Sequence, residues 1–333
     1  MRSLAVRARL YVVQVASVLL VASSAAAQSA RFAFVSNEGS HDVTIIDLSS
    51  NKVVGTLAVA GRARGIQVSP DQRRIYVAVS DDKPRTQGSA DAIAIIDVAS
   101  KKVVATYPVG TNPEQFAVTP DGTRLYASNE DGGTATAIDL RTGKTLATLV
   151  VGIEPEGVGI SPDGRWAYVT SETSNSVSVI DTHSNKVVGN MLVDLRPRVV
   201  VFSPGGKRAF VTAEVGGSVT VIDTRTREIL ATFPLARGEE KPVGLAISPD
   251  GKRLYVAGGH SDRLSVVDAR TYKTIATIAV GKRPWGVAIT PDGRYVYTAN
   301  GLSNDVSIID TRTNKVTGTI GVGTRPWGVA IAR

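Results

Sequence analysis

The side chains with the clearest chemical potential in this sequence recur beside loop prolines, at regular intervals along the chain. One series, named here the ring positions, is the residue after the loop proline or its equivalent: Arg64, Glu114, Glu156, Arg198, Val243, Trp285 and Trp327. A second series, the collar positions, lies two residues earlier: Arg62, Asn112, Glu154, Arg196, Lys241, Arg283 and Arg325. Five of the seven collar positions are basic. Brought together, a basic collar beside two tryptophans would suit an anionic or planar ligand through charge and stacking.

These positions supply the residues that we predict to bind a ligand or partner. They are Arg62, Arg64, Glu114, Glu156, Arg196, Arg198, Lys241, Arg283, Trp285, Arg325 and Trp327. A purely structural interpretation competes, because Pro-Trp-Gly segments can cover the core between repeats and arginine stems can lie along apolar surface.

Residues suited to catalysis are scarce. The sequence has no cysteine and only three histidines, and none of the three has a partner nearby in the sequence. It also lacks the G-x-S-x-G, H-E-x-x-H and phosphate-loop motifs. Glu114, Glu154 and Glu156 could hold a cation through oxygen ligands, but their basic neighbours favour an ion-pair network. We therefore predict no catalytic residue, no metal site and no cofactor, and we favour a protein that is not an enzyme.

A 42-residue period supplies the elements that must position these side chains. An aspartate closes an apolar run seven times, and an aromatic residue precedes each one by 13 residues in six cases and by 21 in the other. The aspartates are Asp47, Asp97, Asp139, Asp181, Asp223, Asp268 and Asp310. Short strands repeating at a period near 40 predict a β-propeller. We interpret the aspartates as caps on turns.

One unit shows four short β-rich runs, which we name strands A to D from the channel outward. In the clearest unit strand A covers 157–160, the Ser-Pro-Asp-Gly turn follows, and strands B, C and D cover 166–170, 177–181 and 187–189. Strand A and the B–C pair each occur seven times, but residues 32–59 supply only B, C and D, and residues 328–331 only A. The sequence thus predicts an all-β, seven-bladed propeller of four-stranded blades, closed by pairing the N-terminal strands with the C-terminal strand A.

Two insertions depart from the period. Eight extra residues lie in a B–C loop within 81–91, and three more lie in a D–A loop around 237–241. Both loops belong to the same face of the disc, and binding commonly uses variable loops on one side of a rigid scaffold. We expect the face of the B–C and D–A loops to be the functional one.

The first 27 residues read as a signal peptide, with Arg2, Arg7 and Arg9 before an apolar run at 10–21 and a small-residue cleavage pattern that ends at Ala27. The predicted domains are therefore this signal peptide at 1–27 and a single propeller at 28–333. We expect a periplasmic or secreted protein without a membrane span. Removing the segment lowers the net charge from +8 by three arginines to +5, which by itself is weak support for nucleic-acid binding.

Tetrapeptides such as Phe34-Val35-Ser36-Asn37 and Tyr126-Ala127-Ser128-Asn129 lead into strands such as Val306-Ser307-Ile308-Ile309-Asp310. In these residues the sequence resembles the YVTN family of β-propeller repeats, most of all the periplasmic subgroup associated with pyrroloquinoline-quinone (PQQ) dependent alcohol catabolism. The resemblance implies a propeller and a setting near a quinoprotein dehydrogenase system. It carries over no active-site residue.

Three functions stay open. The favoured one is a non-catalytic binding or accessory module with a protein partner or a small anionic or planar ligand. The second is a lactonase- or lyase-like enzyme that uses Glu114, Glu154, Glu156 and His260 at the channel. The third, less favoured, is single-stranded nucleic-acid binding by the basic collar and the tryptophans.

Overall fold

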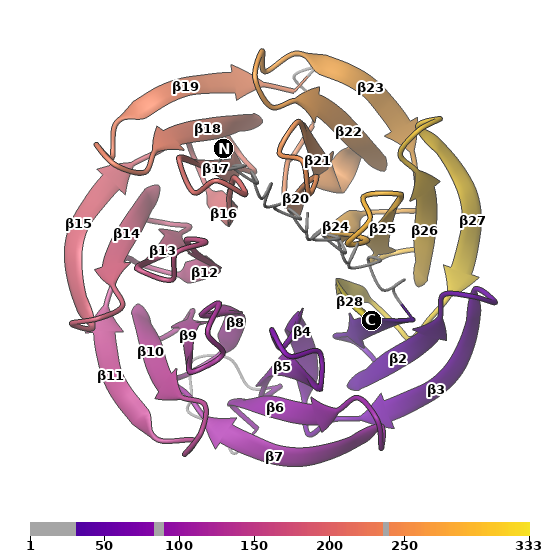
Figure 1. Cartoon of the computed structure of the whole chain (residues 1–333), viewed down its shortest axis with the longest axis horizontal. Helices are drawn as coiled ribbons and strands as arrows, with labels where there is room; N and C mark the ends of the chain where they lie inside the picture. The colour runs from indigo at the N-terminus through magenta and orange to yellow at the C-terminus, as the bar shows by residue number, and fades with distance from the viewer. Residues whose placement is uncertain (1–30, 83–89, 236–239) are drawn as a thin grey trace, which may run out of the picture.

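The computed structural model describes residues 31–82, 90–235 and 240–333. In these residues seven four-stranded antiparallel sheets surround a central channel, which confirms the predicted seven-bladed propeller (Figure 1). The predicted signal peptide lies outside the described residues, and so do positions 83–89 and 236–239, which contain most of the two insertions. No helix in the described part of the chain is long and apolar enough to cross a membrane.

Each blade runs from an inner strand A at the channel to an outer strand D at the rim. The first four blades are β28 (Pro326–Ala332), β1 (Phe32–Asn37), β2 (Asp42–Asp47) and β3 (Lys52–Ala58); β4 (Arg62–Val68), β5 (Arg74–Ser80), β6 (Ala92–Asp97) and β7 (Lys102–Pro108); β8 (Pro113–Val118), β9 (Arg124–Asn129), β10 (Thr134–Asp139) and β11 (Thr145–Val150); β12 (Pro155–Ile160), β13 (Trp166–Ser171), β14 (Ser176–Asp181) and β15 (Lys186–Leu192). The other three are β16 (Pro197–Phe202), β17 (Arg208–Ala213), β18 (Ser218–Asp223) and β19 (Ile229–Pro234); β20 (Leu245–Ile247), β21 (Arg253–Ala257), β22 (Arg263–Asp268) and β23 (Thr274–Ala279); β24 (Pro284–Ile289), β25 (Tyr295–Asn300), β26 (Asp305–Asp310) and β27 (Lys315–Gly321). A single 3-10 turn, η1 (Gly259–Ser261), is the only helical element in the described residues.

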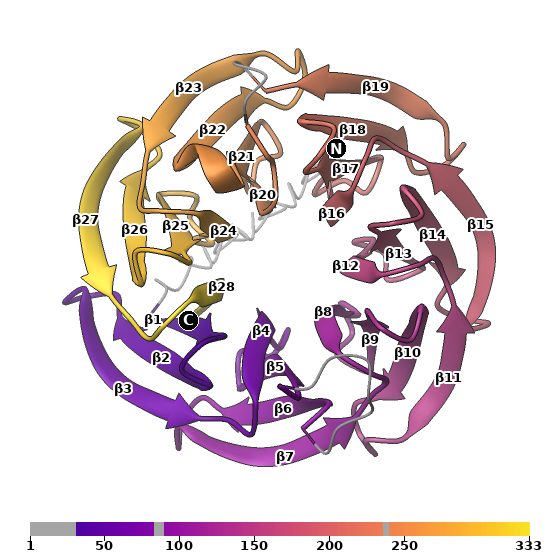
Figure 2. The same ribbon diagram turned by 180° about the vertical axis from the view of Figure 1, so that it is seen from behind.

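The ring closes as predicted, by pairing the two ends of the propeller. Strand β28 lies beside β1 in the sheet β28-β1-β2-β3, with Phe34 opposite Ala330 and Phe32 opposite Ala332. This pairing satisfies the backbone groups that the edge of β1 would otherwise leave exposed. Figures 1 and 2 show the two faces of the closed disc.

The repeated aspartates are turn caps, which confirms their structural interpretation. Oδ1 of Asp223 accepts hydrogen bonds from the backbone N–H groups of Arg225 and Thr226, both at 2.9 Å, and the other six make equivalent bonds. The bond from the Thr226 backbone lowers the pKa of Asp223. These carboxylates are engaged in local structure and are not available for catalysis.

Apolar side chains between adjacent blades form the core. Phe34, Tyr126, Tyr168, Phe210 and Tyr255 are among the largest fully buried side chains, and each comes from the B strand of its blade. Because the aromatic residue recurs once per unit, every blade contributes one large ring to the packing against its neighbour. The core therefore follows the same period as the strands and fixes the channel around which the ring positions lie.

Candidate functional site

The ring positions are held at the channel mouth by an irregularity at the start of strand A. The prediction that strand A begins near Gly157 is corrected: β12 begins at Pro155, which pairs with Ser171, and the register then shifts before Val158. The same shift follows Ala63, Pro113, Pro197 and Pro284. A bulge re-aims the side chain that it contains, and in these five blades that side chain is the ring residue.

Hydroxyl groups of the repeated tetrapeptide fix the backbone at the same points. The Ser36 hydroxyl donates to the carbonyl of Arg64 at 2.5 Å, and Thr170 donates to the carbonyl of Arg198 at 2.8 Å. Ser128 bonds the carbonyl of Glu156 in the same way. Each bond joins one blade to the next, so the repeat scaffold sets the position of the charged ring.

Arg198 is the centre of one ion cluster. Its guanidinium contacts the carboxylates of Glu156, Glu172 at 2.5 Å and Glu214 at 2.6 Å. The Arg198 side chain is only 8% exposed. Burial lowers the pKa of Arg198, but the attraction of Glu156, Glu214 and Glu172 outweighs burial and raises it overall. A guanidinium thus occupies the centre of the acidic group.

Arg64 is the centre of a second ion cluster at the mouth. It contacts Glu114, Glu38 at 3.2 Å and Glu130 at 3.5 Å. Burial is the largest influence on Arg64 and lowers its pKa, while burial raises the pKa of Glu130. The ion-pair network that we set against a cation site is therefore present in both clusters.

Four of these carboxylates were missed by reasoning from the sequence. Glu38, Glu130, Glu172 and Glu214 each follow the last residue of strand B directly. The signal was available, because the residue after the tetrapeptide is Glu in these four units and Gly in the sixth and seventh blades, at Gly259 and Gly301. Comparison of this one position across the seven repeats would have located the acidic partners of Arg64 and Arg198.

Trp285 and Trp327 meet between neighbouring blades, of which the blade of Trp285 lacks such a glutamate and the blade of Trp327 carries Glu38. Their ring centroids are 6.1 Å apart with the planes tilted by 47°. The guanidinium carbon of Arg283 lies 5.1 Å from the centroid of Trp285, and that of Arg198 lies 5.4 Å from it. Trp327 is buried at 8% exposure whereas Trp285 is half-buried. Trp285 is therefore the indole that a ligand can reach more easily.

The mouth is a cavity of about 440 Å³ whose lining includes nine of the eleven predicted binding residues. These nine are Arg64, Glu114, Glu156, Arg196, Arg198, Arg283, Trp285, Arg325 and Trp327. Arg62 and Lys241 are not part of the lining; Arg62 instead donates to Asn112 at 2.9 Å. Whether the lining residues bind a ligand stays a prediction.

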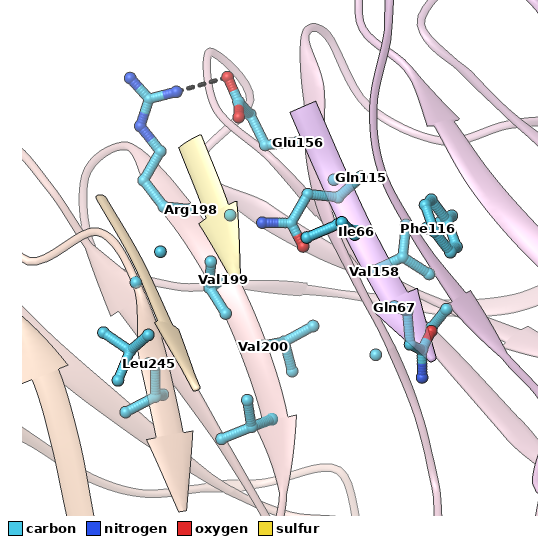
Figure 3. Close-up of a pocket in the computed structure, with 18 of the residues that line it drawn as sticks. Ile66, Gln67, Gln115, Phe116, Glu156, Val158, Arg198, Val199, Val200 and Leu245 are labelled. Atoms are coloured by element: carbon cyan, nitrogen blue, oxygen red, sulfur yellow. Dashed lines mark hydrogen bonds and ion pairs between the residues drawn. The ribbon is translucent and has the colours of Figure 1, made fainter. Parts of the chain in front are cut away.

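A second cavity of about 390 Å³ continues along the channel. Figure 3 shows Arg198 and Glu156 bonded at one end of it, above a wall of Val158, Val199 and Val200. The charged groups therefore end where a channel lined by the A strands begins, with Gln67 and Gln115 among its apolar side chains.

Comparison with known proteins agrees with this architecture. Residues 186–325 match the family model described as "Lactonase, 7-bladed beta-propeller", and residues 21–139 match the "Choice-of-anchor I domain". The fold of the chain is a seven-bladed β-propeller, and the lactonase model matches less than half of its length. No curated protein matches the sequence.

Solved structures similar to this propeller come from several organisms. A chain of Kuenenia stuttgartiensis hydrazine synthase has 27% identity and a TM-score of 0.75, with 84% of this chain and 92% of that chain covered. A putative 6-phosphogluconolactonase from Bacteroides fragilis has 18% identity and a TM-score of 0.76, with 92% and 99% covered. A protein of unknown function from Desulfotomaculum acetoxidans has 17% identity and a TM-score of 0.76, with 91% and 99% covered. The last two show likeness of fold alone.

The three histidines of the propeller do not converge. Nε2 of His260 lies 2.8 Å from Nη1 of Arg283, whereas Nε2 of His41 lies 3.2 Å from Oδ1 of Asp82. His183 is in a C–D turn on the opposite face. Within residues 31–82, 90–235 and 240–333, no three His, Asp or Glu side chains are arranged so that they could hold a metal ion.

Glu156 is the mouth carboxyl with the most perturbed acidity. Burial raises its pKa to about 8, even though Arg198 opposes the shift. Below that pH Glu156 carries a proton, and the charge of Arg198 is balanced by Glu172 and Glu214. A protonated carboxyl beside a fixed guanidinium can donate a hydrogen bond or exchange a proton with a bound molecule.

This acidity predicts a pH-dependent stability. The folded pKa of Glu156 is raised above its unfolded value, so its contribution favours folding most below the unfolded pKa and declines as pH rises toward 8. We expect Glu156→Gln to remove this decline, which amounts to roughly 2 to 4 kcal/mol. Urea unfolding of both proteins at a series of pH values measures it. The prediction is wrong if the unfolding free energies of the parent protein and Glu156→Gln differ by the same amount at every pH between 5 and about 8.

Proposed function

We propose that this propeller is an exported, non-catalytic binding module that holds a small anionic ring compound at its channel mouth. The observation that carries the proposal is the division of charge around the mouth cavity. On one side Arg64 and Arg198 are buried and surrounded by glutamates. On the other side Arg283 and Arg325 flank the accessible indole of Trp285 in the same cavity.

The arginines beside the tryptophans keep capacity for a ligand. Arg325 has a side chain 64% exposed, and its ion pair with Glu38 is long at 3.7 Å. Arg283 stacks on Trp285 and lines the mouth together with Leu302. A ring that bears carboxylates would stack on the indole and accept hydrogen bonds from both guanidiniums.

A place near quinoprotein alcohol oxidation is the finer part of this proposal. It rests on the resemblance to the periplasmic YVTN subgroup, and the match of residues 21–139 to a choice-of-anchor domain supports export. Pyrroloquinoline quinone is itself a planar compound with several carboxylates, so it meets the chemical requirements of the mouth. A periplasmic quinoprotein dehydrogenase is the corresponding protein partner.

The test is a titration with a chemically matched set of probes. Isothermal titration calorimetry with pyrroloquinoline quinone and with citrate distinguishes a planar anion from a flexible one. We expect the quinone to bind and Trp285→Ala to weaken binding about tenfold, because a desolvated cation–π and stacking contact contributes roughly 1 to 2 kcal/mol. Arg325→Gln should weaken it by a similar factor.

The chain contains its own matched control. Trp166 is a tryptophan engaged by two guanidiniums, Arg165 at 4.7 Å and Arg227 at 4.8 Å, but it lies at the opposite face of the disc. Trp166→Ala should leave the affinity unchanged. The proposal fails if neither probe binds, or if Trp166→Ala lowers the affinity as much as Trp285→Ala does.

Lactone hydrolysis is the second candidate, favoured by the lactonase family match and by Glu156. With a pKa of about 8, Glu156 could give a proton to the leaving oxygen of a lactone near neutral pH. Turnover of aldonolactones that is lost in Glu156→Gln would establish this function. Absence of turnover, with and without divalent cations, would exclude it and leave the binding module.

A further inference from the structure

The opposite face of the disc carries the largest concentration of positive charge in the protein. Thirteen six-residue turns join strands A to B and C to D at this face, and all of them lie within the described residues. They are 69–74, 119–124, 161–166, 203–208, 248–253 and 290–295, then 47–52, 97–102, 139–144, 181–186, 223–228, 268–273 and 310–315. Together they hold 21 Lys and Arg against 13 Asp and Glu, a net charge of +8. The rest of residues 28–333 holds 14 Lys and Arg against 17 Asp and Glu.

Most of this positive charge is not neutralised by ion pairs. Twelve of the 13 acids are aspartates that accept backbone hydrogen bonds in their own turns, as Asp71 and Asp163 do at 3.1 Å. Among the turn residues, all of which the structure describes, ion pairs are limited to Lys252 with Asp250 and Arg294 with Asp310. The remaining cations therefore project a field of one sign from a flat face.

Exposed apolar side chains lie directly beside this charge. In every blade a basic residue comes at or just before the start of the outer strand: Lys52, Lys102, Lys144, Lys186, Arg227, Lys273 and Lys315. Within three residues follows a large apolar side chain that is 37% to 55% exposed: Val54, Val104, Leu146, Val188, Leu230, Ile275 and Val316. At about 3.3 Å of rise per residue these side chains stay within about 10 Å of the turns.

We propose that this basic face, with its apolar rim, binds the surface of an anionic lipid bilayer. Lysine ammonium groups can reach lipid phosphates while the valine and leucine side chains enter the boundary of headgroups and acyl chains, which is about 5 to 10 Å deep. The seven-fold repetition presents this combination around the whole disc, so the face can lie flat on a planar surface. The mouth with Trp285 and Arg325 then points away from the membrane.

A lipid surface fits these observations better than a nucleic acid does. Single-stranded nucleic acid requires aromatic platforms for stacking. The tryptophan at this face, Trp166, is already engaged by Arg165 and Arg227. An apolar rim gives no advantage to phosphate-backbone binding, whereas it adds salt-resistant affinity for a bilayer.

The test is co-sedimentation of the protein with vesicles of phosphatidylcholine, alone or mixed with phosphatidylglycerol. We expect binding to the mixed vesicles only, weakened by salt but not abolished. Lys102→Gln combined with Lys144→Gln, on neighbouring blades, should lower the partition coefficient about tenfold. Val104→Ser combined with Leu146→Ser should lower the binding that remains at high salt about threefold.

A matched pair on the other face provides the control. Arg263 begins strand C and Lys282 lies in a D–A loop, so both project from the face that carries the mouth. Arg263→Gln combined with Lys282→Gln should leave vesicle binding within twofold of the parent, with thermal unfolding used to show that every variant is folded. The proposal is overturned if the mixed vesicles are not bound, if this control pair weakens binding as much as the lysine pair, or if only a single-stranded oligonucleotide binds.

Discussion

Arg198→Met is expected to destabilise the protein by about 3 to 5 kcal/mol, because it removes the buried cation that balances several buried carboxylates. The Arg198 side chain is 8% exposed, and those of Glu214 and Glu172 are 6% and 11% exposed. Without the guanidinium, these carboxylates would face one another in a poorly hydrated site. Urea unfolding at neutral pH measures the loss.

Arg196→Met is the matched control for that prediction. Arg196 also contacts Glu172, at 2.5 Å, and Glu214, at 3.5 Å, so the same acids lose one cation. Its side chain is 43% exposed, however, and exposed ion pairs contribute about 0 to 1 kcal/mol. Lowering the pH should also reduce the loss in Arg198→Met, because the glutamates become protonated. Equal losses in the two variants would show that burial does not decide the energy of this cluster.

Removal of strand β28 is expected to abolish cooperative folding of the propeller. A chain that ends at Arg325 would expose the edge of β1 and lose the contacts of Trp327, Val329 and Ala332, all of which are buried. Domains of this kind are stable by only about 5 to 15 kcal/mol in total, and an open edge also invites association between chains. The measurement is thermal unfolding followed by circular dichroism, together with size-exclusion chromatography.

Deletion of Arg333 alone is the control for the truncation. This residue lies beyond β28, is exposed, and contributes one backbone hydrogen bond, to Gln72 at 3.1 Å. Its removal should leave the melting temperature nearly unchanged. A truncated chain that still unfolds in one sharp transition as a monomer would show that ring closure is not required.

The fold was predictable because its signals are local and repeated. The turn at Ser161–Gly164 and the cap at Asp223 each involve residues a few positions apart, so spacing alone reveals them. The same spacing showed that β28 must complete the first blade, since residues 32–59 lack a strand A. A single short apolar run does not identify a strand by itself, but several copies of it at a fixed spacing do.

The candidate site was only partly predictable, because its energetics depend on contacts between blades. The sequence placed Arg198 and Glu156 in one series, 42 residues apart, but not the identity of their partners. Glu172 and Glu214 lie in B–C loops, whereas Arg198 and Glu156 lie at the D–A loops. Only folding at the channel mouth brings these two glutamates within 2.6 Å of Arg198. Glutamates therefore pair with Arg62 and Arg196 of the predicted collar, whereas Arg283 and Arg325 keep their charge for the mouth. Most of the other free charge of the disc lies on the face that the insertions had led us to set aside.

The sequence by itself determined the seven blades, their closure and the turn chemistry, because these follow from short-range patterns that recur with a fixed period. The tertiary structure decided which charges remain available, because neutralisation depends on distances between side chains far apart in the chain. It paired Arg64 and Arg198 with buried glutamates, and it left Arg325 at the mouth and the lysines of the opposite face exposed to solvent.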